Sequence, residues 1–192
     1  MILIIDNCSQ MVLQFEARLK RWGITYRKIS HDQPLDFDLA RMTGLVLSGG
    51  PGNPYGPLNL SADFVALSQL EVPTIGFCLG FEIMSVYFGG QIGELECEHS
   101  GPETVVIDDP SDPLLSGLPR EIELVKKHSL CVTSIGTELC CLAHSKTCSY
   151  EIIRHSQRPM WGFQSHPEAS PGPGEIIIAR FLAECGLVLP VT

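Results

Sequence analysis

The chain has 192 residues, a formal net charge of −9 and a hydrophobic content of 44%. This length suffices to bury a core without disulfides or metals, and a single domain over residues 1–192 is expected. The acidic charge and the lack of clustered Lys and Arg argue against a nucleic-acid partner, because phosphate binding requires grouped cations.

The amino-terminal stretch MILIIDN has too short an apolar run, and too little positive charge, for a secretory signal. No stretch reaches the roughly 20 apolar residues of a membrane-spanning helix. The sequence therefore predicts a cytoplasmic protein that does not enter a membrane. In that compartment its eight irregularly spaced cysteines are expected to remain free thiols.

Short apolar strands alternate with helices over the first half of the chain. Strands are expected at residues 3–5, 24–30, 44–48 and 73–77, and helices at residues 12–22, 60–70 and 80–88. Asn7, with Gln10 three residues later, is expected to cap the first helix. Such alternation predicts a parallel sheet with helices on both faces.

The second half of the chain is expected to be mostly β-structure. Strands are expected within TVVIDD (104–109), EIELVKK (121–127), ELCCLAHS (138–145), YEIIRHS (150–156) and MWGFQS (160–165), before a closing helix at residues 175–185. The fold class is therefore α/β: an open, mostly parallel sheet with helices on both faces, plus an antiparallel extension.

Cys140, Cys141, His144 and Cys148 form the tightest group of potential metal ligands and invite a zinc interpretation. Two of them are neighbours in an expected strand, where successive side chains point to opposite faces. Structural zinc sites instead use paired knuckles of closely spaced ligands. We therefore expect buried thiols here, and neither a metal nor a cofactor is expected in the protein.

The stretch IGFCLGFEIM (75–84) places Cys78 between Gly76 and Gly80, where an expected strand turns into a helix. A cysteine kept only for packing needs no such glycines, whereas a nucleophile on a cramped strand-to-helix turn does. A helix amino terminus also favours the thiolate, because unpaired N–H groups stabilise negative charge. From this motif alone, a nucleophile and a buried thiol both remain open for Cys78.

A cysteine nucleophile needs a base and a group that orients the base. The stretch GFQSHPEAS offers both, in His166 and Glu168, directly after an expected strand. Pro167 is expected to keep the segment extended, so that residues two apart point the same way. The alternative is a solvated His-Pro-Glu turn.

The glycine-rich loop SGGPG (48–52) also follows an expected strand. Glycines let backbone N–H groups approach a ligand closely, so Gly50 and Leu79 are candidate donors to a tetrahedral oxyanion. In an open parallel sheet, ligands bind beyond the carboxyl ends of the strands, where this loop and Cys78 are expected. The alternative is an ordinary Gly/Pro turn without a ligand.

The three motifs, G-x-C-L-G preceded by S-G-G-P-G and followed by H-P-E, together resemble the class I (triad) glutamine amidotransferases over nearly the whole chain. The resemblance implies a flavodoxin-like fold, with Cys78 as nucleophile, His166 as base and Glu168 as its orienter. The implied reaction is hydrolysis of the glutamine side-chain amide through a thioester, which releases ammonia for a synthase. Because 192 residues leave no room for a synthase, the synthase is expected to be a separate subunit.

The same resemblance implies substrate contacts. Gly50, Gly52 and Leu79 match the family's backbone donors, and in KKHSLCV (126–132) Ser129 and Leu130 match a segment that approaches the glutamine backbone. The stretches DNCSQ, LSGGP and LAHSKTCSYEIIRH resemble the GMP synthase type, whereas HSLCV and GPGNP resemble the anthranilate and aminodeoxychorismate synthase types. We favour the GMP synthase type.

Two residues depart from the family pattern. Glu82 replaces the Gln of G-x-C-x-G-x-Q, and Ser165 replaces a common aromatic residue before the histidine. A carboxylate at Glu82 can accept from the substrate's ammonium group, but it should also raise the pKa of Cys78. These departures keep two alternatives open: a regulatory subunit without turnover, and a stand-alone γ-glutamyl hydrolase acting on another amide.

Overall fold

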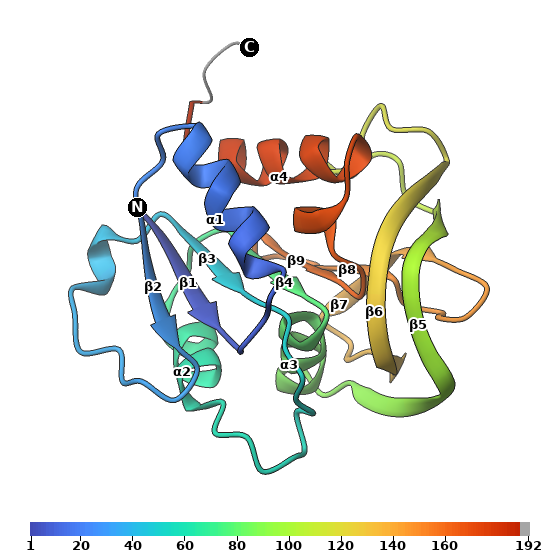
Figure 1. Ribbon diagram of the computed structural model, residues 1–192, viewed down its shortest axis with the longest axis horizontal. Coiled ribbons are helices and arrows are strands. Elements are labelled where there is room, and N and C mark those ends of the chain that lie inside the picture. Colours follow the sequence, from blue (N-terminus) through green and yellow to red (C-terminus); the bar gives the residue numbers. More distant parts are fainter. Residues whose placement is uncertain (189–192) are drawn as a thin grey trace.

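The computed structural model describes residues 1–188 and contains a nine-stranded mixed sheet in the order β2-β1-β3-β4-β9-β8-β7-β5-β6 (Figure 1). Its parallel strands are β1 (Ile2–Asp6), β2 (Tyr26–Ser30), β3 (Gly44–Leu47), β4 (Thr74–Phe77) and β9 (Met160–Phe163). Its antiparallel strands are β5 (Gln91–Ile107), β6 (Glu121–Ser134), β7 (Leu139–His144) and β8 (Ile152–His155). The predicted parallel sheet with an antiparallel extension is confirmed.

Helices cover both faces of the parallel half. The helices are α1 (Val12–Arg21), α2 (Ser61–Gln69), α3 (Leu79–Tyr87) and α4 (Pro173–Glu184), with short 3-10 turns η1 (Leu39–Arg41) and η2 (Pro167–Ala169). Alternate residues of β1 point to opposite faces. Ile2 and Ile4 therefore pack in the cluster that includes α1 and α4, while Leu3 and Ile5 pack in the cluster that includes α2 and α3.

The parallel strands bring four connecting segments to one edge of the sheet. Because β1, β3, β4 and β9 run in the same direction, their carboxyl ends lie together. The segments that leave them are residues 7–11, 48–60, Cys78 and 164–168. This is the edge at which open α/β sheets bind ligands.

The antiparallel hairpin is longer than the sequence predicted. β5 begins at Gln91 and β6 ends at Ser134, and the two strands pair along most of their length, with a bulge between Glu94 and His99. Most of β5 is partly or fully exposed and carries charged residues and glycines, so its apolar alternation is weak.

The first helix begins at the predicted residue, but its cap differs from the prediction. α1 starts at Val12, its cap position is Met11, and no side chain caps it. Asn7 is fully buried and donates through Nδ2 to Ser48 O and to Asp63 Oδ1, both at 3.0 Å. The prediction that Asn7 caps this helix is therefore wrong, because its amide joins two loops and a second helix instead.

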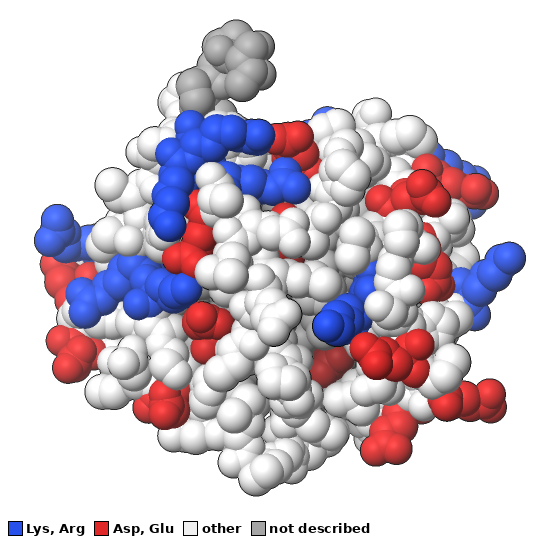
Figure 2. All heavy atoms as spheres, viewed as in Figure 1, with Lys and Arg blue, Asp and Glu red and all other residues white. Residues whose placement is uncertain are grey.

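Lys and Arg side chains gather over α1 and β2 on the face shown in Figure 2. Several of them pair with acidic side chains: Lys28 with Asp6 and Glu16, and Arg21 with Glu175. Part of the positive charge on this face is therefore neutralised by neighbouring carboxylates. Within residues 1–188, none of the helices combines the length and apolar character needed to cross a bilayer.

Candidate active site

Cys78 occupies the turn between β4 and α3. Its backbone has φ 48° and ψ −107°, a conformation that L-residues other than glycine rarely adopt. The N–H of Cys78 donates to Phe163 O at 2.7 Å, which ties the turn to β9. Strain of this kind persists only where the surrounding structure enforces it, and it is concentrated at functional sites.

The glycines beside Cys78 allow this turn to form. A Cβ on Gly76 would lie 2.7 Å from the carbonyl carbon and oxygen of Gly80, and a Cβ on Gly80 would overlap Leu47 O. Both contacts are with backbone atoms, which cannot move aside cheaply. The prediction that crowding explains both glycines is confirmed.

His166 and Glu168 form a buried pair after β9. The distance between His166 Nδ1 and Glu168 Oε1 is 2.7 Å, and both side chains are at least 96% buried. The segment is not extended as predicted, because Pro167 begins the 3-10 turn η2. The turn nevertheless brings the carboxylate back to the ring, and the solvated His-Pro-Glu turn is excluded.

The backbone of His166 is held by β6. Its N–H donates to Val125 O at 2.8 Å, and its carbonyl accepts from Ser170 Oγ at 2.8 Å. Ser170 Oγ in turn accepts from the N–H of Val125 at 2.9 Å. Two of these bonds, both to Val125, join the segment after β9 to β6, and the third closes the turn between His166 and Ser170.

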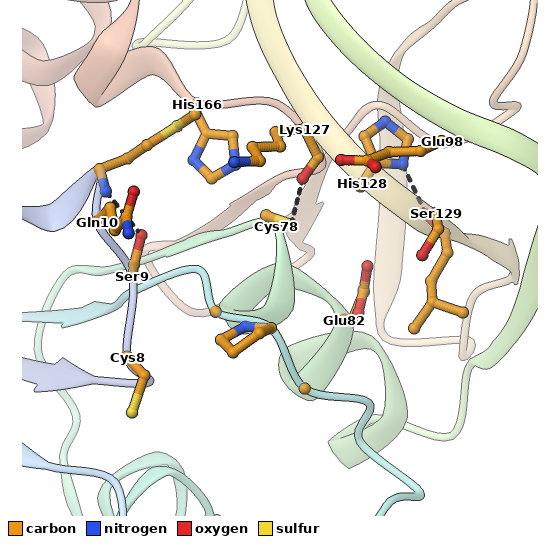
Figure 3. Close-up of a pocket in the computed structure, with 15 residues that line it drawn as sticks. Cys8, Ser9, Gln10, Cys78, Glu82, Glu98, Lys127, His128, Ser129 and His166 are labelled. Carbon is orange, nitrogen blue, oxygen red and sulfur yellow. Dashed lines mark hydrogen bonds between the residues drawn. The ribbon is translucent and has the colours of Figure 1, made fainter.

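Cys78 and His166 both approach Gly49, and the Cys78 thiol donates to Lys127 O at 3.7 Å (Figure 3). A Cβ on Gly49 would lie 2.9 Å from His166 Cε1 and 3.4 Å from Cys78 Cβ, so both side chains contact the space above this glycine. Both line a pocket of about 470 Å³, in which the His166 ring lies above Cys78 in the view of Figure 3. The pocket is lined by Cys8, Ser9, Gln10, Met11, Gly50, Pro51, Gly52, Cys78, Glu82, Glu98, Lys127, His128, Ser129, Leu130 and His166.

The predicted backbone donors adjoin Cys78. Gly50 and Gly52 line the pocket, and the N–H of Leu79 is directed at Cys78 Sγ, where it acts to lower the pKa of the thiol. Gly50 packs so closely on Asn7 that a Cβ would overlap the Asn7 carbonyl oxygen. The glycine-rich loop is therefore shaped by a close backbone contact beside the pocket.

Comparison with known proteins identifies this arrangement. The family model for glutamine amidotransferase class-I matches residues 3–185. The chain belongs to the class-I glutamine amidotransferases.

Its relatives cover almost all of its length. A glutamine-hydrolysing GMP synthase subunit from Pyrococcus abyssi is 32% identical over 189 residues, which cover 97% of this chain and 99% of that protein. The protein of the same name from Thermococcus kodakarensis is 33% identical over 190 residues, with 97% and 99% coverage. A solved Thermoplasma acidophilum structure, provisionally assigned to the corresponding GMP synthase subunit, has a TM-score of 0.87 at 26% identity and covers 96% of this chain and 93% of that one.

The surroundings of Cys78 disfavour the thiolate form. Burial raises the pKa of Cys78 well above its ordinary value, and the carboxylates of Glu82 and Glu168 raise it further, against the lowering by the N–H of Leu79. The helix terminus was predicted to favour the thiolate. Its effect on the pKa is smaller than the opposite effect of burial. The predicted effect of Glu82 is confirmed in direction. A thiol in these surroundings would need a neighbouring base in order to act as a nucleophile.

Glu82 is a buried carboxyl close enough to Cys78 to raise the pKa of its thiol. It is 2% exposed, lines the pocket and accepts from Gln164 Nε2 at 3.0 Å. Burial raises the pKa of Glu82 to about 7, although the Gln164 hydrogen bond and the nearby His166 act to lower it. Glu82 therefore does not face solvent, although it lies in the first turn of α3. Ser165, the other departure from the family pattern, is fully buried and does not line the pocket.

Replacing Glu82 with Gln is expected to make Cys78 more reactive. Gln keeps an acceptor for Gln164 and removes the carboxylate that raises the pKa of the thiol, so alkylation by iodoacetamide at pH 8 should accelerate by about 3- to 10-fold. The exposed Glu96, changed to Gln, is the matched control. An alkylation rate for Glu82→Gln equal to that of the control would contradict the assignment.

The same substitution should flatten the dependence of stability on pH. Because the pKa of Glu82 is raised in the folded state, folding retains its proton, and stability falls as pH rises from about 4.5 to about 7. Glu82→Gln removes that loss. Its free energy of unfolding at pH 8 is expected to exceed that of the wild type by roughly 1–3 kcal/mol. Urea unfolding of both proteins at pH 5 and pH 8 measures this difference in stability. The same pH dependence of stability in both proteins would contradict the prediction.

The segment after Lys127 forms the opposite wall of the pocket. Ser129 and Leu130 line the pocket, as the resemblance implied. His128 also lines it, with Nδ1 2.7 Å from Leu130 O, so this ring is oriented by a backbone carbonyl. Burial lowers the pKa of His128, which favours the neutral ring.

The group that invited a zinc interpretation is only partly buried; its members are Cys140, Cys141, His144 and Cys148. Cys148 is buried as expected, but Cys140 is exposed, which corrects the prediction of buried thiols for that residue. Cys141 contributes its Sγ to a contact with Ser149 O at 3.5 Å. The ring of His144 binds Asp108 instead, with 2.7 Å between Nδ1 and Oδ2.

Several pocket residues escaped the sequence analysis. Lys127 and Glu98 line the pocket from neighbouring strands, and Glu98 lies within the bulge of β5. The segment from Cys8 to Met11 lines it because β1 ends at the same edge as β3 and β4. Because β1 was expected to end at that edge, the sequence could have predicted that residues 8–11 line the pocket. No sequence pattern predicts the bulge that places Glu98 there.

Proposed function

We propose that this amidotransferase hydrolyses the side-chain amide of glutamine at Cys78 and supplies the ammonia to a separate synthase subunit of the GMP synthase type. The observation that carries the proposal is the buried His166–Glu168 pair, which shares one pocket with Cys78 across Gly49. Nucleophile, base and orienter are the minimum set for hydrolysis through a covalent intermediate.

In the first step His166 acts as general base. With Nδ1 directed at Glu168, Nε2 is the nitrogen that takes the proton from Cys78 Sγ, and the sulfur attacks the amide carbon of glutamine. The carbonyl oxygen becomes an oxyanion, which accepts from the N–H groups of Gly50 and Leu79. Losing one such donor typically lowers the rate about 10²- to 10³-fold.

In the second step His166 acts as general acid. It returns the proton to the amide nitrogen, the C–N bond breaks, and ammonia leaves a γ-glutamyl thioester on Cys78. A water then gives a proton to His166 and attacks the thioester carbon. Breakdown of this second tetrahedral species releases glutamate, and His166 returns the proton to the sulfur.

The α-amino-acid end of glutamine is assigned to the rim of the pocket. Gly52, Ser129 and Leu130 supply polar backbone groups there, and Glu82 supplies a carboxyl that accepts from the ammonium group. Charge-assisted hydrogen bonds of this kind are roughly twice as strong as neutral ones. The substitution of Glu82 for the family's glutamine is thereby accommodated.

The proposed partner follows from the relatives, whose names describe one subunit of a glutamine-hydrolysing GMP synthase. They are similar in length to this chain, so a second chain must carry the synthase activity. A single domain over residues 1–192 and a cytoplasmic location belong to the same proposal. The eight free cysteines support that location.

Ammonia release from glutamine by the purified chain, alone and with a GMP synthase subunit carrying the acceptor-binding activity, tests the proposal. We expect release that depends on glutamine and rises when the acceptor and the synthase subunit are present. No release under either condition would favour a regulatory subunit. Faster hydrolysis of another γ-glutamyl amide than of glutamine would favour a stand-alone hydrolase.

A further inference from the structure

Asp63 is a fully buried carboxyl that the proposed reaction does not use. It lies in the first turn of α2, and its exposed fraction is 0%. Burial raises the pKa of Asp63 to about 7, with partial compensation from the hydrogen bond to Asn7. Burying such a group is costly, and buried carboxyls without a cationic partner are rare in proteins.

The only side chain that binds Asp63 in the described part of the chain is Asn7. Asn7 Nδ2 donates to Asp63 Oδ1 and to the carbonyl of Ser48, both at 3.0 Å. An amide has two ends, and an ionised carboxylate can only accept hydrogen bonds. Asp63 therefore selects the orientation in which Nδ2 also reaches the Ser48 carbonyl.

Asn7 and Ser48 in turn support the glycine-rich loop. The N–H of Asn7 donates to Ser48 Oγ at 2.9 Å, and Ser48 Oγ donates to Gly49 O at 2.8 Å. Gly50 lies directly on the carbonyl oxygen of Asn7, with no space for a Cβ between them. A continuous set of contacts thus leads from Asp63 to the backbone of Gly50.

The contacts between Asp63 and Asn7 leave buried polar atoms unpaired, which lowers stability. Asp63 Oδ2 and Asn7 Oδ1 are both buried without a hydrogen-bond partner among the described residues. Each unsatisfied buried oxygen costs about 1–3 kcal/mol, so an apolar pair at these positions would be the more stable choice. Unsatisfied groups are tolerated where they maintain a geometry that function requires.

We propose that Asp63 is a positioning residue for the oxyanion-binding loop: through Asn7 and Ser48 it holds the N–H of Gly50 at the position where the tetrahedral oxyanion forms. The inference rests on the proposed function, in which Gly50 is an oxyanion donor. Asp63 itself touches neither the substrate nor Cys78. It affects the transition state through the loop alone.

Asp63→Ala is expected to lower kcat for glutamine hydrolysis at least 10-fold and to change KM less than 3-fold, because the oxyanion exists only in the transition state. Alkylation of Cys78 by iodoacetamide forms no oxyanion, so its rate should remain within 2-fold of wild type. Asp63→Asn retains an acceptor oxygen and should keep kcat within 3-fold of wild type. Ser61→Ala, exposed on the same helix, is the matched control.

Two outcomes would overturn the inference. One is a kcat for Asp63→Ala within 2-fold of the Ser61→Ala control. The other is an alkylation rate that falls in proportion to kcat, because a general loss of structure produces that result. If Asp63→Ala does not fold, Ser48→Ala removes the next contact in the network and is expected to show the same lowered kcat with unchanged alkylation. Wild-type protein without glutaminase activity would instead refute the proposed function.

Discussion

Cys78→Ala is expected to abolish ammonia release from glutamine, with a loss of about 10⁴-fold or more in kcat. The substitution removes the atom to which the γ-glutamyl group is transferred, and no other thiol lines the pocket beside His166 except that of Cys8. In Figure 3 the Cys8 side chain points away from Cys78 and His166. The coupled or direct assay for ammonia measures the effect.

Cys148→Ala is the appropriate control for that result. Its thiol is also buried, so the substitution tests the loss of a buried sulfur without touching the pocket. Cys148→Ala should retain glutaminase activity, and a glutamine analogue carrying an electrophile should modify Cys78 alone. Turnover by Cys78→Ala at more than one hundredth of the wild-type rate would contradict the assignment.

Glu151→Leu is expected to lower the free energy of unfolding by about 3–5 kcal/mol. Glu151 forms an ion pair with Lys126, both side chains have 0% exposure, and Ser145 Oγ donates to the carboxylate at 2.6 Å. Removing the acid leaves a buried ammonium whose remaining carboxylate neighbour is Glu103, at 3.1 Å. Urea unfolding followed by circular dichroism measures the loss.

The double variant Lys126→Met/Glu151→Leu separates the ion pair from the packing. Replacing both charges with apolar side chains of similar size should recover at least half of the lost stability, since the unpaired charge is gone. Lys127→Met, at an exposed neighbouring residue, should change stability by less than about 0.5 kcal/mol. A double variant as unstable as Glu151→Leu would show that the loss of stability does not come from the unpaired charge of Lys126.

The central strands of the parallel half were predictable because they are buried on both faces. The residues of β3 (GLVL) and β4 (TIGF) are all buried, so each strand reads as a short continuous apolar run. The long hairpin of β5 and β6 was only half predicted. Its exposed residues and bulge depend on how the hairpin curls over the pocket, which local sequence does not encode.

The site was predictable as far as chain order and strand ends determine it. Cys78, His166 and Gly50 each follow a buried strand, and parallel strands bring their ends together. The environment of these residues was less predictable. The pKa of Cys78 depends on complete burial and on two carboxylates, of which Glu168 is 90 residues away in the chain.

The environment of Asp63 could not be predicted from the sequence either. In the sequence it is an acid in the first turn of a helix, a position that the helix dipole already favours. Its burial and its bond to Asn7 arise only when α2 packs against the end of β1. The contacts on which the proposed role rests are visible in the structure and have no signature in the local sequence.

The most direct test of the account is to trap the covalent intermediate. Wild-type protein is mixed rapidly with glutamine, quenched with acid and analysed by peptide mass spectrometry. The account predicts a γ-glutamyl thioester on the peptide containing Cys78, and none in Cys78→Ala. Ammonia release without any adduct at Cys78, or with the adduct on another cysteine, would contradict it.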